Sequence, residues 1–185
     1  MRHRFLSMAL VVLILSGCKS GNEKYLNSKW DNISLNNGQA SFESPFKMDV
    51  KDVSKEIAQV KQYLVSMEMR ISPESNTNFL VLADAIEYVE EITADYKSAA
   101  ESSLKGVEKQ GKISSISFTT SDIELAGKAG VQQSGTFKLG GAMYKFKQNV
   151  YGYKNKLVQL LVASPQKDEA GGEIMEKVLK SLTIK

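Results

Sequence analysis

Hydrophobic side chains recur at every second position along residues 63–71, with Ser66, Glu68 and Arg70 among the residues between them. A period of two is typical of a strand with one buried face. The next apolar run, residues 79–83, has no polar face and predicts a central strand covered from both sides. Residues 72–76 between these two strands have the composition of a turn. The residues expected to face the core in the first strand are Tyr63, Val65, Met67, Met69 and Ile71.

The second half of the chain predicts a meander of strands. Gly-rich or Asn-containing turns separate its apolar segments, among them Gly127 to Gly130, Gly140-Gly141 and Tyr153 to Asn155. Short connections indicate antiparallel pairing, because parallel neighbours need a long crossover. The predicted strands cover residues 113–118, 131–138, 142–151 and 155–163.

Two helices and a hairpin complete the pattern. Residues 94–110 have apolar positions at helical spacing, with Thr93 as the expected N-cap and Gly111 just after the end. A second amphipathic helix is expected from Glu173 to Leu182, because Gly171-Gly172 would weaken an earlier first turn. Near the N-terminus, Asn36-Asn37-Gly38 joins two short apolar segments, which is a strong hairpin signal. Residues 48–58 fit either a loop or one or two turns of helix.

The order of strands, helix, strands and helix indicates one α+β domain over residues 31–185. We expect a single antiparallel sheet of about six strands with helices packed on its faces. The total length of 185 residues also suits one domain.

This arrangement resembles a known fold family. The hairpin ending in Phe42-Glu43-Ser44-Pro45, the mid-chain helix, the meander and the closing Leu179 to Ile184 segment are similar to the PsbP-like fold, and most similar to DcrB-type bacterial envelope lipoproteins. The resemblance implies helices on both faces of the sheet, no enzyme chemistry, and an accessory or partner-binding role. It carries no functional residue over to this chain.

The N-terminal segment predicts export and lipidation. Arg2 and Arg4 precede an apolar run that, as a helix, would span only about 16 Å, roughly half of a membrane's hydrocarbon core. The segment therefore fits a removed signal peptide over residues 1–17. It ends in a sequence that resembles the bacterial lipobox, which makes Cys18 the expected lipidation site. The lipobox residues are Leu15, Ser16 and Gly17.

Residues 18–30 are expected to form a lipidated tether, since they are rich in Gly, Asn, Ser and Lys. Within it, Trp30 is expected to dock onto the edge of the domain, with an exposed anchor as the alternative. Lys19 follows the cysteine where an Asp would indicate inner-membrane retention. The outer membrane is therefore favoured if the host is Gram-negative.

Charge is unevenly distributed along the chain. The net charge of +3 falls to +1 when the two signal-peptide arginines are removed. Residues 125–167 contain seven lysines and no Asp or Glu, so the rest of the mature chain carries −6. Lys145 and Lys147 alternate with Tyr144 and Phe146. If the aromatic set packs inward, the lysines would form an exposed positive stripe.

Such a stripe would suit an anionic envelope component or an acidic protein. The alternative is a solvated lysine face that protects the sheet from edge pairing. A nucleic-acid partner is not expected outside the cytoplasm. The predicted partner-binding residues are Lys138, Lys145, Lys147, Tyr151, Tyr153, Lys154 and Lys156.

Catalysis has few candidate residues. The only histidine, His3, belongs to the predicted signal peptide, so the mature chain could form neither a Ser-His-Asp triad nor a Cys/His zinc site, and no cofactor is expected. Carboxylates remain as candidates for a hydrolase, but Asp84 and Glu87 would point to opposite faces of a strand. The alternatives are a solvated strand end for these acids, or oxygen-only Ca²⁺ binding at Glu90 and Glu91. Asp95 would stabilise a helix N-terminus.

The sequence therefore predicts a lipid-anchored, non-enzymatic envelope protein that binds a macromolecular partner or an anionic surface. A small-ligand carrier with a pocket between sheet and helix is the alternative.

Overall fold

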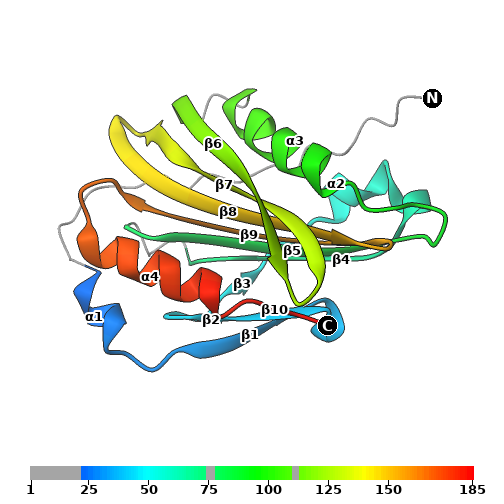
Figure 1. Ribbon diagram of the computed structural model, residues 1–185, viewed down its shortest axis with the longest axis horizontal. Coiled ribbons are helices and arrows are strands. Elements are labelled where there is room, and N and C mark those ends of the chain that lie inside the picture. The colour runs from blue at the N-terminus through cyan, green and yellow to red at the C-terminus, as the bar shows by residue number, and fades with distance from the viewer. Residues whose placement is uncertain (1–21, 74–77, 110–112) are drawn as a thin grey trace.

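A computed structural model describes residues 22–73, 78–109 and 113–185. The predicted signal peptide, Cys18 and Gly111 lie outside these ranges. The described part of the chain is an α+β structure in which antiparallel sheets pack with helices, as expected (Figure 1). None of the helices described there has the length and apolar character needed to cross a membrane.

The main sheet has seven strands in the described residues, in the order β3-β4-β5-β9-β8-β7-β6. All of its neighbouring strands are antiparallel. The meander is longer than predicted at its start, because β6 continues well past residue 118. The strands are β3 (Asp49–Val50), β4 (Leu64–Ile71), β5 (Leu80–Tyr88), β6 (Ile113–Leu125), β7 (Lys128–Leu139), β8 (Ala142–Tyr153) and β9 (Lys156–Pro165).

The predicted N-terminal hairpin forms a second sheet instead of joining the first. Strands β1 (Asp31–Leu35) and β2 (Ala40–Ser44) pair across a short 3₁₀ turn, η1 (Asn36–Gly38). In this turn Asn36, Asn37 and Gly38 all have positive φ, a conformation that Asn and Gly tolerate best. The C-terminal β10 (Thr183–Ile184) pairs with the other side of β2.

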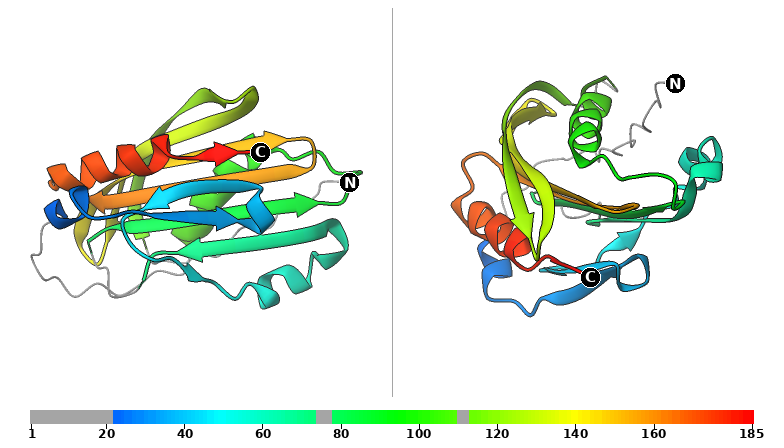
Figure 2. Two further views of the ribbon diagram at one scale, coloured as in Figure 1. Left: turned by 90° about the horizontal axis from the view of Figure 1, so that it is seen from below. Right: turned by 45° about the vertical axis from the view of Figure 1, so that its right-hand side comes forward.

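Helices cover both faces of the main sheet. Helix α3 (Tyr96–Lys109) lies on one face, and α4 (Glu169–Lys180) lies with the small sheet on the other (Figure 2). Leu104 of α3 belongs to the first hydrophobic core, and Ile174 and Val178 of α4 belong to the second. The shorter helical segments are α1 (Glu23–Leu26), α2 (Ser54–Ala58) and η2 (Lys61–Tyr63).

Both long helices begin at an aspartate. The side chain of Asp95 accepts a hydrogen bond from the backbone N–H of Ser98, so Asp95, rather than Thr93, caps α3. Asp168 caps α4 by accepting from the N–H of Gly171 at 2.9 Å. Helix α4 therefore starts four residues before the predicted Glu173. The glycine that was expected to weaken it lets the helix approach β9, since a Cβ on Gly171 would lie 2.7 Å from Ser164.

The predicted inward face of β4 is only partly correct. Met69 is buried, but Val65 is 63% and Tyr63 is 41% exposed. The register of β4 against β5 shifts between Leu64 and Ser66. A bulge adds one residue to a strand, so the alternation of faces that holds after the bulge is inverted before it. Leu64 therefore takes the core position that the alternation assigned to its neighbours.

Candidate functional site

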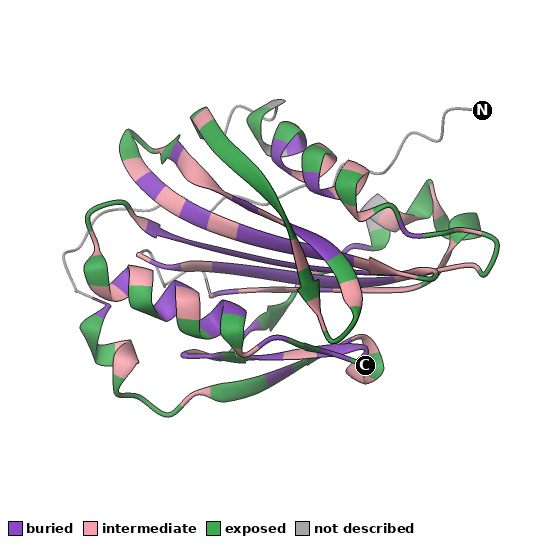
Figure 3. Cartoon of the chain, in the orientation of Figure 1, coloured by how far each residue is buried: buried purple, intermediate pink, exposed green. Residues whose placement is uncertain are grey.

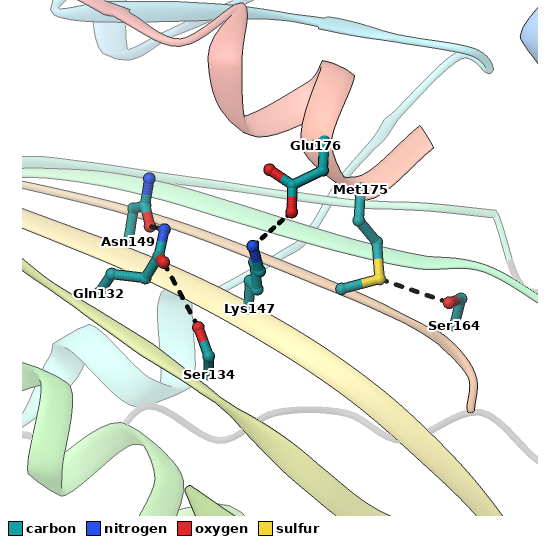
Figure 4. A network of polar contacts seen from close by, with 7 residues as sticks. All are labelled: Gln132, Ser134, Lys147, Asn149, Ser164, Met175 and Glu176. Carbon is teal, nitrogen blue, oxygen red and sulfur yellow. Dashed lines mark hydrogen bonds and ion pairs between the residues drawn. The ribbon is translucent and has the colours of Figure 1, made fainter. Parts of the chain in front are cut away.

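The predicted lysine face of β8 is covered by α4. Tyr144 and Phe146 do pack into the first core, as expected. The opposite face was expected to be exposed, but its residues Lys145, Lys147 and Asn149 are intermediate or buried, and β8 carries these two colours over most of its length (Figure 3). The Nζ atom of Lys145 donates to the backbone carbonyl oxygen of Asp168 at 2.6 Å. Lys147 forms an ion pair with Glu176 (Figure 4). Both lysines are half-buried, so the predicted exposed stripe does not form on this strand.

The other predicted binding residues are dispersed. Lys156 lies 3.5 Å from Glu87 in an ion pair. Tyr151 is buried in the second core, and Tyr153 packs against that core with the Lys128 ammonium 5.2 Å from its ring centroid. Two of the lysines are exposed, and they lie near opposite ends of β8. These two are Lys138 and Lys154.

The predicted acidic residues do not converge either. Asp84 and Glu87 lie on opposite faces of β5, as expected from their spacing. Glu90 and Glu91 are exposed in the loop after β5. Hydrogen bonds from Ser98 lower the pKa of Asp95. Across residues 22–73, 78–109 and 113–185, no three His, Cys, Asp or Glu side chains lie close enough to hold a metal ion.

Asp84 differs from the other acids because it is fully buried in the middle of the sheet. The strand that was expected to end near Ala83 continues to Tyr88, so the predicted solvated position for Asp84 is wrong. Gln159 lies directly opposite it on β9 and donates an amide hydrogen bond to its Oδ1 at 3.1 Å. This bond compensates part of the cost of placing a carboxyl group beside Leu82 and Ile86 in the core.

A row of buried glutamines extends from Asp84 across the α3 face of the sheet. Gln148 on β8 donates to Gln159 at 3.3 Å, and Gln133 on β7 lies directly opposite Gln148. Ser103 of α3 reaches Gln148 at 3.5 Å. The row therefore spans four neighbouring strands beneath the helix. We refer to Asp84, Gln159, Gln148 and Gln133 as the buried polar row.

Two acceptor atoms of the buried polar row lack a hydrogen-bond partner among the described residues. They are Asp84 Oδ2 and Gln133 Oε1. Burial raises the pKa of Asp84 to about 7, and the Gln159 hydrogen bond offsets only part of this rise. Burial also raises the pKa of Tyr88 to about 12, with the Asp84 charge as a smaller cause. The pKa of Asp84 therefore lies close to neutral pH. Glu87 on the same strand points to the opposite face, so these two acids do not form the facing pair that a carboxylate-based hydrolysis needs.

The sequence pattern contains a signal for the buried polar row. Gln148 stands between Phe146 and Val150 on one strand face, and Gln159 stands between Leu157 and Leu161. Each glutamine occupies a position where the alternation calls for an apolar side chain. Polar residues at core positions of neighbouring strands predict a hydrogen-bonded group inside the sheet.

Comparisons with known proteins identify the fold. No protein-family model and no curated protein sequence matches the chain. Among solved structures, the chain is similar to cyanobacterial PsbP (CyanoP) from Synechocystis sp. PCC 6803, with a TM-score of 0.58 and 11% identity over 85% of this chain and 94% of that one. The fold is PsbP-like. The chain also matches LpqN of Mycobacterium tuberculosis, described as involved in cell envelope biogenesis, with a TM-score of 0.46 and 12% identity over 84% and 90% of the two chains.

Proposed function

We propose that this PsbP-like chain is a lipid-anchored accessory protein of a bacterial cell envelope that acts by binding a partner. The observation that carries the proposal is the position of the lipobox-like sequence relative to the domain. Leu15 to Cys18 end an apolar segment, and the described fold starts at Asn22, only four residues after the cysteine. A diacylglycerol on Cys18, with further acylation, would hold such a domain firmly at a membrane.

The dispersion of the acidic side chains supports binding over catalysis. Asp84 is enclosed by the core, Glu87 is paired with Lys156, and Asp95 caps a helix. In this proposal the partner is an anionic envelope component or an acidic protein. Its contacts on the 138–156 segment are the two exposed lysines, Lys138 and Lys154, because the other lysines there have partners within the domain.

The anchor is tested by replacing Cys18 with Ala in cells fed an alkyne analogue of palmitate. We expect the wild type to incorporate the label and to sediment with membranes, and Cys18→Ala to lose both properties. Ser20→Ala, two residues later, is the matched control and should keep both. Membrane association of Cys18→Ala equal to that of the wild type would refute the lipid anchor.

The partner is tested by capture from detergent-solubilised envelopes. Lys138→Glu and Lys154→Glu together should reduce the captured material. The double variant Lys29→Glu and Lys61→Glu, at two exposed lysines elsewhere, controls for the same change in charge. An identical set of captured components from all three proteins would contradict the assignment of these lysines.

The buried polar row favours a second candidate function, a carrier of a small hydrogen-bond donor. Asp84 Oδ2 and Gln133 Oε1 are acceptors without a partner among the described residues, and both lie on the sheet face that α3 covers. Native mass spectrometry of protein purified from cells would detect such a ligand. It should be lost on Asp84→Leu substitution, and a wild-type protein that is always ligand-free would rule the carrier out.

A further inference from the structure

The segment expected to be a free tether is fixed to the domain from Asn22 onward. Asn22 is only 1% exposed, and its side-chain amide donates to the Asn78 carbonyl at 3.2 Å and to Asp168 Oδ2 at 2.5 Å. Its two partners come from the start of β5 and from the cap of α4. Because the buried amide of Asn22 has both of these hydrogen bonds, the chain is fixed to the domain at this residue.

The rest of the segment packs along α4. The indole N–H of Trp30 donates to the Tyr25 carbonyl at 2.8 Å, and the Lys177 ammonium lies 3.8 Å from the centroid of the Trp30 ring. The ring of Tyr25 also contacts Phe46 edge-on. The expected docking of Trp30 is therefore confirmed, and Asn22 and Tyr25, within the predicted tether of residues 18–30, also contact the domain.

Covalent geometry then limits how far the domain can stand from a lipid on Cys18. Four residue steps separate Cys18 from Asn22, and a fully extended chain spans at most about 3.6 Å per residue, or about 14 Å in all. The domain is much longer than this distance. Strand β9 alone has 10 residues, which corresponds to about 30 Å at the usual rise of a strand.

Three of the described connections lie at the same end of the domain as Asn22. The first is the link from β9 to α4, which contains the exposed Lys167 and the Asn22 partner Asp168. The second is the β7–β8 turn, which is held to this link by a hydrogen bond from Gln166 N–H to the Met143 carbonyl at 2.9 Å. The third leads into β5 and contains Asn78, two residues before the strand. The β8–β9 turn, with Lys154, lies at the opposite end of β9.

We infer that this Asn22 end, meaning the start of α1, the β9–α4 link and the β7–β8 turn, faces the phospholipid surface of the membrane that holds the protein. The inference rests on the proposed lipidation of Cys18. Because the tether is shorter than the domain, it keeps the Asn22 end near the headgroups and directs the β8–β9 turn away from them. That turn, with Lys154, is then free to meet a partner across the periplasm or outside the cell, whereas Lys138, beside the β7–β8 turn, would face the anionic headgroups.

The described charges at the Asn22 end do not oppose contact with phospholipid headgroups. The Asn22 end carries both charge signs, with Lys24 and Lys167 beside Glu23 and Glu169. An exposed apolar side chain, Val65, lies at the opposite end, since the neighbouring Leu64 pairs with the last residue of β5. The lipid and the tether length therefore determine the orientation.

The test uses vesicles and the unique thiol of the chain. Cys18 is the only cysteine, so a chain beginning at Cys18 can be coupled there to a maleimide lipid in phosphatidylcholine–phosphatidylglycerol vesicles. A fluorescent amino acid is placed at Lys167 in one protein and at Lys154 in another. Both positions are exposed, so the label does not disturb the core. The vesicles contain lipids with a nitroxide on the headgroup, which quenches fluorescence at short range.

We expect strong loss of fluorescence at position 167 and little at position 154. Inserting about twelve Gly/Ser residues between Gly21 and Asn22 would give a flexible linker spanning roughly 20 Å on average, and should reduce the quenching at position 167. Equal quenching at the two positions, or quenching that the insertion leaves unchanged, would overturn the inferred orientation. Because the lipid is attached chemically, this result is independent of whether cells acylate Cys18, which the labelling experiment with Cys18→Ala decides.

Discussion

Replacing Asp84 by Asn should make the domain more stable at alkaline pH. The folded protein raises the pKa of this carboxyl from 3.8 to about 7, because the group is fully buried. An acid with a raised pKa in the folded state stabilises that state only while it is protonated. This contribution is complete below the unfolded pKa near 4 and is lost as the pH rises through 7. The wild type should therefore lose stability across this window.

The size of the effect follows from the shift in pKa. Each pKa unit corresponds to about 1.4 kcal/mol, so a rise of about three units gives up to about 4 kcal/mol over the whole window. About two of these units lie above pH 5. The free energy of unfolding of the wild type should then fall by roughly 3 kcal/mol, relative to Asp84→Asn, between pH 5 and pH 8. Asparagine keeps the shape of the side chain and an oxygen that can accept from Gln159.

Urea unfolding at several pH values measures this difference. Trp30 is the only tryptophan and packs against Lys177, so its fluorescence reports unfolding in a Cys18→Ala chain without the signal peptide. Asp95→Asn is the matched control, since the pKa of Asp95 is lowered and its contribution to stability is lost at acid pH instead. Parallel stability curves for wild type and Asp84→Asn from pH 5 to pH 8 would show that Asp84 does not titrate in the folded state as argued.

The packing of α4 against the main sheet gives further predictions, each measured by urea unfolding at pH 7. Gly171→Ala should destabilise the domain by about 1–3 kcal/mol, because the new methyl group would lie 2.7 Å from Ser164 in a tight contact. Gly172→Ala should be neutral or stabilise by up to about 1 kcal/mol, because its methyl would meet only the end of a flexible lysine and alanine favours the helix. The reverse order of the two variants would contradict this packing. Lys147→Met should change stability by less than about 1 kcal/mol, since its ion pair with Glu176 is 31% and 45% exposed at the two side chains.

Local periodicity predicted those features of the fold that depend on neighbouring residues. The antiparallel meander, the hairpin at Asn36 to Gly38 and both long helices follow from patterns within about fifteen residues. The bulge in β4 could not be predicted in this way. It is defined by the register against β5, so the exposure of Val65 depends on a strand that comes later in the sequence.

The buried polar row shows the same limitation. An aspartate after Ala83 reads as the end of an apolar strand, because a charged side chain is costly inside a sheet. Here the partner that makes the position tolerable, Gln159, is 75 residues away in sequence. Only the pairing of β5 with β9 places the amide beside the carboxyl group. The site was therefore missed even though all its residues were visible in the sequence.

Helix α4 accounts for the two largest differences between the predicted and observed surfaces. Its cap is Asp168 and its first residue is Glu169, earlier than its glycines suggested, and this added turn brings the Asp168 carbonyl oxygen to Lys145 on the polar face of β8. Lys145 and Lys147 then find partners on α4 rather than in solvent. The same cap residue also accepts a hydrogen bond from Asn22, which belongs to the segment predicted to be a tether. The turn that binds Lys145 is thus also the point at which a lipid on Cys18 would orient the domain. If Cys18 carries a lipid, the binding surface that remains accessible lies around Lys154, at the end of the sheet opposite this turn.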